Sequence, residues 1–206
     1  ATELDWFPNG VNTEYFKPGT EPKDPELLSF VGRMDYYPHQ DAGFSFCGEA
    51  LPRIRKARPG VKLVIVGANP SRQVKDLESI PGVTVTGSVP DVRPHVLRSS
   101  VSVVPLQIAR GTQHKVLETL AMGIPTVVSD AAAGGIDATP GEHFLTASTP
   151  QEFAVAVLRL LDDPGLRRNL SEAGRRRMLT HHSWDSSMTK LDSIVERCFE
   201  LSPSRG

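Results

Sequence analysis

Residues 111–130 combine residue types that could bind phosphate. Their pattern indicates a glycine turn, a short amphipathic helix and a buried strand. Thr112 is the expected N-cap of the helix, and Lys115 and Glu118 lie three positions apart on one of its faces. A helix start presents free backbone N–H groups and the positive end of the helix dipole, which suits an anion. With a lysine in the first turn and a carboxylate one turn later, we expect a nucleotide to bind here.

A simpler interpretation of the same two side chains is an exposed ion pair on a helix. Lys115 and Glu118 at this spacing would then contribute about 0.2–0.5 kcal/mol and have no other role. The glycine turn before them and the strand after them favour the binding role.

The elements that position these residues follow from an alternation of short apolar runs and longer helical patterns after residue 26. This alternation predicts a Rossmann-like, doubly wound α/β fold with a parallel sheet of about six strands. The expected strands are 27–31, 61–66, 83–86, 101–104, 125–128 and 142–147. The main expected helices are 42–57, 71–77, 112–122, 150–161 and 183–200, with a further helix beginning near 163.

The two ends of the sequence differ from this central part. Residues 1–26 are rich in turn formers and indicate a linker or arm, whose few apolar side chains need a surface to pack on. Residues 27–182 form the expected ligand-binding domain, and residues 183–206 carry a last helix.

Each of the first five expected strands ends in a glycine, a proline or a small polar residue. In a doubly wound sheet the ligand lies at the carboxyl ends of the strands, near the point where the strand order reverses. We therefore expect five loops to line one crevice: 32–33, 67, 88–91, 105–112 and 129–135.

Composition limits the kinds of partner. The chain has 206 residues, of which 39% are hydrophobic and 23% charged, as expected for a soluble globular domain. No apolar run approaches the roughly 20 residues of a membrane helix, and a net charge of −1 gives no support to a nucleic-acid partner. Cys47 and Cys198 lie far apart without metal-ligand spacing, so we expect no metal site.

Several of these segments resemble the C-terminal, donor-binding half of a GT-B glycosyltransferase of the retaining kind grouped in glycosyltransferase family 4. The most specific match is residues 115–128. Residues 34–38 and 111–115 are similar to a bacterial subgroup tied to exopolysaccharide synthesis and exosortase-linked sugar transfer. Further matching segments are 8–11, 31–33, 64–67, 85–87 and 89–91.

The resemblance implies a hexosyltransferase-like enzyme that passes a sugar from a nucleotide diphosphate-sugar to a glycan or a lipid-linked acceptor. It implies no cofactor, since the nucleotide-sugar is a substrate. It also implies a separate N-terminal domain that binds the acceptor, so this chain alone would be inactive and residues 183–206 would pack toward that domain. The expected location is the cytoplasm, including the inner face of the membrane for a peripherally associated full-length protein.

The resemblance also implies roles for individual residues. Arg33 and Lys115 would stabilise the leaving diphosphate, which is the main catalytic need when a sugar–phosphate bond breaks. Glu118 would accept hydrogen bonds from the ribose hydroxyls, and Arg110 takes the place of the first glutamate of the family's pair. The remaining expected substrate-binding residues are Gly32, Val89, Asp91, Gly111, Thr112, His114, Gly134 and Gly135.

The sequence departs from the family pattern at a second position. The lysine usual a few residues beyond Arg33 is missing, and residues 37–40 stand in its place, so Lys115 would compensate for it. Of the histidines, we expect only His114 to belong to the site and the others to lie at the surface or at caps. Two alternative functions stay open: a sugar-nucleotide epimerase of the same architecture, and a non-catalytic binding module in which Arg110 marks a decayed site.

A cluster of arginines near the C-terminus has two interpretations. It could attract an anionic membrane surface. We favour a solvated helix face balanced by Asp162, Asp163 and Glu172. The arginines are at positions 167, 168, 175, 176 and 177.

Overall fold

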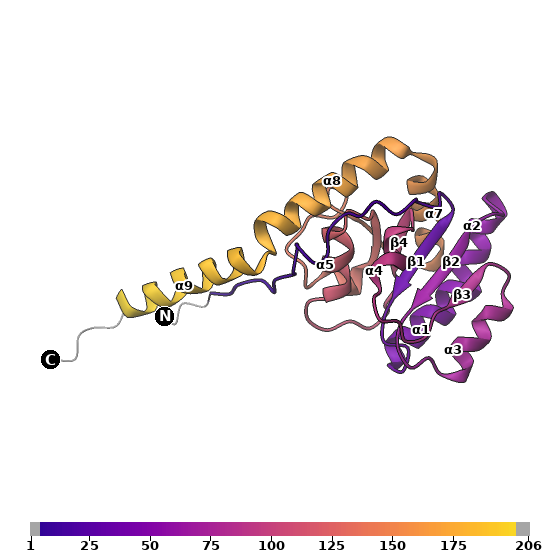
Figure 1. Cartoon of the computed structure of the whole chain (residues 1–206), viewed down its shortest axis with the longest axis horizontal. Helices are drawn as coiled ribbons and strands as arrows, with labels where there is room; N and C mark the ends of the chain where they lie inside the picture. Colours follow the sequence, from indigo (N-terminus) through magenta and orange to yellow (C-terminus); the bar gives the residue numbers. More distant parts are fainter. Residues whose placement is uncertain (1–4, 201–206) are drawn as a thin grey trace.

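Six parallel strands form the centre of the computed structural model, which describes residues 5–200 (Figure 1). Their order in the sheet is β3-β2-β1-β4-β5-β6, and the order reverses between β1 and β4, as in a doubly wound Rossmann sheet. The predicted fold class is confirmed. The strands are β1 (Leu27–Val31), β2 (Lys62–Val66), β3 (Val83–Val85), β4 (Val101–Val104), β5 (Thr126–Ser129) and β6 (Leu145–Ala147).

Helices follow nearly every strand. Most were predicted, although the expected helix 42–57 begins earlier, at Tyr37, and contains a π-helical segment. In a regular helix the ring of Pro52 would clash with the carbonyl of Gly48, which accounts for the wider turn before it. The helices are α1 (Tyr37–Ser45), η1 (Phe46–Ala50), α2 (Leu51–Ala57), α3 (Arg72–Asp76), η2 (Leu77–Ser79), α4 (Arg93–Leu97), α5 (His114–Ala121), α6 (Asp130–Ala133), α7 (Pro150–Asp162), α8 (Pro164–His181) and α9 (Trp184–Glu200).

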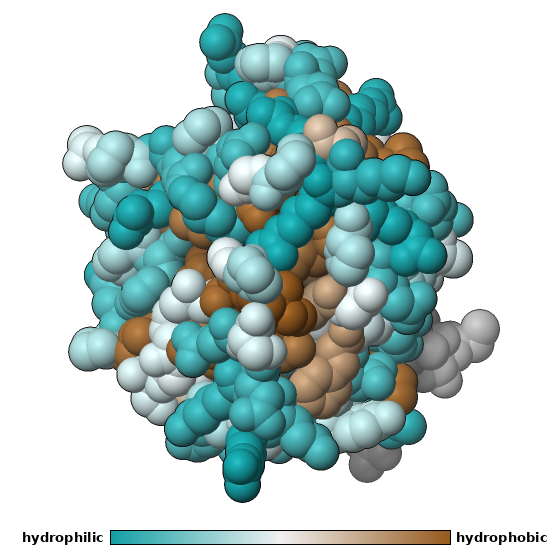
Figure 2. All heavy atoms as spheres, turned by 90° about the vertical axis from the view of Figure 1, so that its right-hand side faces the viewer, coloured by the Kyte–Doolittle hydropathy of each residue, from teal (hydrophilic) through white to brown (hydrophobic). Residues whose placement is uncertain are grey.

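The helices cover both faces of the sheet. α1, η1, α2 and α7 contact one another, whereas α5 packs on β5 and is covered by α8. β4 and β5 are buried along their whole length, as expected for strands covered on both faces. Figure 2 shows the side of the molecule beyond β3, where hydrophilic side chains surround a central apolar band.

The arm packs partly on the domain itself. Val11 is buried, and its N–H donates to the carbonyl oxygen of His182 at 2.6 Å. Further along, the guanidinium of Arg93 lies 3.7 Å from the ring centre of Tyr15. A neighbouring domain is therefore not needed to cover every apolar side chain of this segment. Trp6 and Phe7 stay exposed, at 59% and 39%.

The last helix projects from the body of the molecule. Figure 1 shows α9 extending away from the sheet beside the first described residues of the arm. Trp184 at its start is 46% exposed and packs against Gly10. Every helix within residues 5–200 is too short or too polar to span a bilayer.

Candidate functional site

Two of the predicted loops meet at the carboxyl edge of the sheet. The loop at Gly134–Gly135 packs so closely on the turn before α5 that a Cβ atom on Gly135 would lie 2.6 Å from the carbonyl oxygen of Gly111. Gly111 itself has a φ of 64°, in the left-handed region that favours glycine. The close contact therefore accounts for the glycine at position 135, and the backbone conformation for the glycine at position 111.

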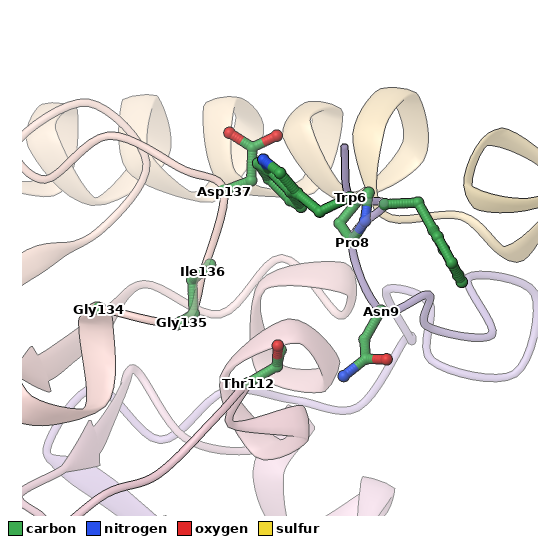
Figure 3. A pocket seen from close by; sticks show the side chains of 9 residues that line it. Trp6, Pro8, Asn9, Thr112, Gly134, Gly135, Ile136 and Asp137 are labelled. Carbon is green, nitrogen blue, oxygen red and sulfur yellow. The ribbon is translucent and has the colours of Figure 1, made fainter. Parts of the chain in front are cut away.

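A cleft of about 490 Å³ opens beside this contact. Figure 3 shows it between the arm, which carries Trp6, Pro8 and Asn9, and the loops that carry Thr112 and residues 134–137. The structure thus brings Thr112, Gly134 and Gly135 together, as the sequence predicted. The first turn of α5, with Lys115, continues from the Thr112 side of the cleft.

The start of α5 differs in detail from the prediction. The N-cap is Gln113, not Thr112, and its side chain makes no capping hydrogen bond. The Gln113 side chain instead donates to the carbonyl oxygens of Arg110 and Gly111, at 3.2 and 3.4 Å. No side chain within residues 5–200 caps α5; the N–H of Val116 donates to the carbonyl oxygen of Gln113, and those of His114 and Lys115 stay available to an anion.

Lys115 is held by a histidine from the other half of the sheet. Its Nζ lies 2.5 Å from Nε2 of His39, and Nδ1 of His39 lies 2.8 Å from the carbonyl oxygen of Arg33. Because a carbonyl oxygen can only accept, Nδ1 carries the ring proton, and Nε2 accepts a hydrogen bond from the ammonium group. The ammonium keeps two N–H groups for other acceptors.

The protonation of this pair follows from its surroundings. Burial, and then the charge of Lys115, lower the pKa of His39 to about 4, so the ring is neutral at pH 7. Burial also lowers the pKa of Lys115 to about 8, while the charge of Glu118 opposes that shift. Lys115 therefore remains mostly a cation near neutral pH, although less firmly than an exposed lysine.

The carboxylate of Glu118 has no hydrogen-bond or ion-pair partner among the described residues. The interpretation of Lys115 and Glu118 as a mere exposed ion pair is wrong, because both are partly buried and Lys115 contacts His39. Burial raises the pKa of Glu118, and the charges of His114 and Lys115 lower it. A partly buried carboxylate without donors is well suited to accept hydrogen bonds from ligand hydroxyls.

Arg33 takes part in the site mainly through its backbone. Its carbonyl oxygen orients His39, whereas its guanidinium is 74% exposed and pairs with Asp35 at 2.8 Å. Gly32 provides the space for the ring, since a Cβ atom there would lie 2.9 Å from Nδ1 of His39. Asp35 accepts from Nε and Nη2 of Arg33, so Nη1 keeps its N–H groups for a ligand anion.

The other predicted residues differ in exposure and in partners. Val89, which follows β3 in the chain, is partly buried. The carboxylate of Asp91 forms an ion pair with Arg93, with 2.7 Å between Oδ2 and Nη2. His114 is exposed, whereas His39, His143 and His182 are buried, so the expectation that the other histidines lie at the surface or at caps is wrong for these three. Arg110 is exposed and forms no ion pair within residues 5–200. The described residues contain no cluster of three metal-ligating side chains.

A family model described as "Glycosyl transferases group 1" matches residues 25–163. The chain belongs to this family. This group 1 glycosyltransferase chain is 26% identical over 157 residues to "Glycosyltransferase 1 domain-containing protein 1" of Xenopus tropicalis, a match that covers 73% of this chain and 45% of that protein. The chain spans about half the length of the curated relatives it matches.

Solved structures place this glycosyltransferase chain within the GT-B architecture. The C-terminal domain of a group 1 glycosyl transferase from Francisella tularensis superposes with a TM-score of 0.69 at 18% identity, and the match covers 85% of this chain and all of that one. The Anabaena protein HepE, solved with UDP and glucose, gives a TM-score of 0.72 at 11% identity over 91% of this chain and 56% of that one. The fold is that of the C-terminal half of a GT-B enzyme.

Proposed function

We propose that this chain is the nucleotide-sugar donor-binding domain of a retaining glycosyltransferase. The observation that carries the proposal is the placement of the Lys115 ammonium, held by neutral His39, at the uncapped start of α5 and one turn before an unpartnered Glu118. Lys115 and the free N–H groups suit a diphosphate, and Glu118 suits a ribose. HepE, which has this fold, was solved with UDP, so UDP is the first ligand to test.

Lys115 and Arg33 would have different roles during sugar transfer. When the bond between sugar and diphosphate breaks, negative charge grows on the departing phosphate oxygen, and a fixed cation stabilises it. Lys115 supplies this cation, and it compensates for the lysine that the family usually carries where residues 37–40 stand here. Arg33 adds further N–H donors to the diphosphate through Nη1, which Asp35 does not use.

The acceptor belongs to the part of the enzyme that this chain does not contain. We propose a glycan or lipid-linked acceptor, with exopolysaccharide as the favoured class, on the strength of residues 34–38 and 111–115. An N-terminal domain would bind this acceptor, and the exposed side chains of the arm and α9 would face it. The chain alone would bind donor nucleotide without transferring sugar.

The proposed function is tested by calorimetric titration of the chain with UDP, GDP, ADP and CMP. We expect at least one nucleoside diphosphate to bind with a dissociation constant below about 1 mM. Absence of heat with all four nucleotides at millimolar concentration would contradict a donor-binding role.

The lowered pKa of Lys115 predicts that diphosphate binding depends on pH. Only the protonated amine attracts the diphosphate, so affinity should be highest below pH about 8 and decline above it. Between pH of about 7 and about 9.5 we expect a loss of roughly tenfold in UDP affinity. The matched control is Lys115→Ala, whose weaker binding should be flat over this range. Equal slopes in both proteins would exclude Lys115 as the titrating group.

A further inference from the structure

A groove runs along α8 at the amino-terminal edge of the sheet, away from the donor site. It consists of two adjoining hollows that share Lys23 and Ser171. One hollow, of about 350 Å³, lies between residues 18–23 of the arm, the turn after α5 and the second half of α8. The other, of about 380 Å³, is bounded by residues just before β1, β4 and β5 and by the first half of α8. Figure 1 shows the arm passing alongside α8 in this region. We call it the α8 groove.

The α8 groove is strongly cationic. Its lining includes one lysine and four arginines but a single carboxylate, Glu172. Glu21, Asp24 and Asp163 adjoin lining residues without lining the groove, so the excess of five cations over one acid belongs to the lining itself, in a chain whose net charge is −1. None of the five cations belongs to an ion pair within the described residues. The cations are Lys23, Arg167, Arg168, Arg175 and Arg176.

Two of the acids expected to balance the arginines contact other groups, and only Asp162 pairs with a different cation; Asp163 keeps its charge, since its donor is a neutral N–H. Asp162 pairs with Arg58 at 2.9 Å. Asp163 caps α8, because its Oδ1 accepts a hydrogen bond from the N–H of Leu166 at 2.8 Å. Of the arginines in the cluster, only Arg177 has a carboxylate partner, Asp137 at 2.6 Å, and it does not line the groove.

Some of the cations are fixed in place before any ligand arrives. Nη1 of Arg167 donates to the carbonyl oxygens of Leu160 and Leu161, at 2.8 Å each, and so closes the end of α7. Nη1 of Arg175 donates in the same way to the carbonyl oxygen of Ala121 at the end of α5. These bonds use neutral acceptors, so they orient the guanidinium groups without cancelling their charge. The side chains of Arg168 and Arg176 are exposed and make no hydrogen bond within residues 5–200.

We propose that the α8 groove is a second binding site, which takes a phosphate-bearing anion at the edge of the sheet opposite the donor. Hollows of this size accommodate a small molecule or a headgroup, and guanidinium groups bind phosphate through paired hydrogen bonds. Burial, and then the charge of Arg167, lower the pKa of Lys23. The phosphate could come from a soluble phosphorylated compound or from a phospholipid headgroup.

The test uses the whole chain with Lys115→Ala, which removes the proposed diphosphate contact of the donor site. The groove variant adds Arg168→Glu and Arg176→Glu. The control adds Arg72→Glu and Lys75→Glu on α3, where both side chains are exposed and the change of charge is the same. Matching urea midpoints establish that both variants are folded. The probes are inorganic pyrophosphate, by calorimetry at low salt, and sedimenting phosphatidylcholine vesicles with about 30% phosphatidylglycerol.

We expect the groove variant to lose roughly tenfold or more in affinity for at least one probe, and the control to stay within about twofold. Loss with pyrophosphate identifies a soluble phosphate compound as the source, and loss with vesicles alone identifies a lipid headgroup. The proposal is overturned if neither probe binds the parent protein, or if the groove variant and the control behave alike.

Discussion

Lys115→Ala should weaken binding of nucleoside diphosphates by about 10- to 150-fold, which corresponds to the 1.5–3 kcal/mol of a charge-assisted hydrogen bond. The loss is large because the ammonium is partly buried, held by His39, and placed beside backbone N–H groups that cannot neutralise a diphosphate alone. Calorimetric titration with UDP measures it. Lys56→Ala is the control, since Lys56 is exposed in the last turn of α2, next to the start of β2 at the opposite edge of the sheet, and should leave UDP affinity unchanged.

A second variant distinguishes the contact with the ribose from the contact with the diphosphate. Glu118→Gln keeps the shape of the side chain but removes the charge that accepts hydrogen bonds from the ribose. It should weaken UDP and leave the affinity for inorganic pyrophosphate nearly unchanged, whereas Lys115→Ala should weaken both ligands. If Glu118→Gln weakens pyrophosphate as strongly as UDP, Glu118 does not bind the ribose.

Gly67→Ala should lower the free energy of unfolding by about 3 kcal/mol or more. A Cβ atom on Gly67 would lie only 1.7 Å from the carbonyl oxygen of Gly32, so the loops after β1 and β2 would have to separate. The N–H of Met34, which donates to the carbonyl oxygen of Ala68 at 3.0 Å, joins the same two loops and would be strained as well. Urea unfolding measures the change as a shift in midpoint at constant slope.

Gly48→Ala provides the matched control for that variant. Gly48 lies in the helical segment η1, and a Cβ atom there would have no neighbour within 4 Å. Because alanine is the better helix former, this substitution should be neutral or stabilise the protein by up to about 1 kcal/mol. Similar unfolding midpoints for the two alanine variants would show that the close approach of the loops does not limit stability.

The fold was predictable because its determinants are local. Buried parallel strands are continuous apolar runs, and the intervening helices have clear caps, such as the capping box formed by Thr149 and Glu152. Boundaries were less predictable. The last strand is only Leu145–Ala147, not 142–147, because Gly141 adopts a φ of 82° and His143 accepts a hydrogen bond from the N–H of Thr139, which form a turn there.

The site was only partly predictable, because its central contact is not local. Lys115 and Glu118 were found from their spacing on one helix, but His39 is 76 residues away from Lys115 in sequence. The two meet only because β1 and β4 are neighbours in the sheet. One signal in the sequence did point to His39: it lies within residues 37–40, where the family's usual lysine is missing.

The packing of the arm could not be predicted from the sequence, for a different reason. Its turn-forming residues predicted a linker or arm, and residues 5–26 contain no helix or strand of the sheet, but composition does not show which surface such a segment covers. Val11 and Phe16 pack into the core, and His182 holds the arm through the carbonyl oxygen of Asn9 at 3.0 Å. Tertiary packing of this kind depends on the assembled surface and leaves no local pattern.

A crystal structure of the chain with bound UDP tests the central claim most directly. We expect a phosphate oxygen at about 3 Å from Nζ of Lys115, beside the first N–H groups of α5, and the ribose hydroxyls on the carboxylate of Glu118. UDP bound elsewhere, with Lys115 still contacting only His39 and Glu118 without a partner, would contradict the proposed donor site.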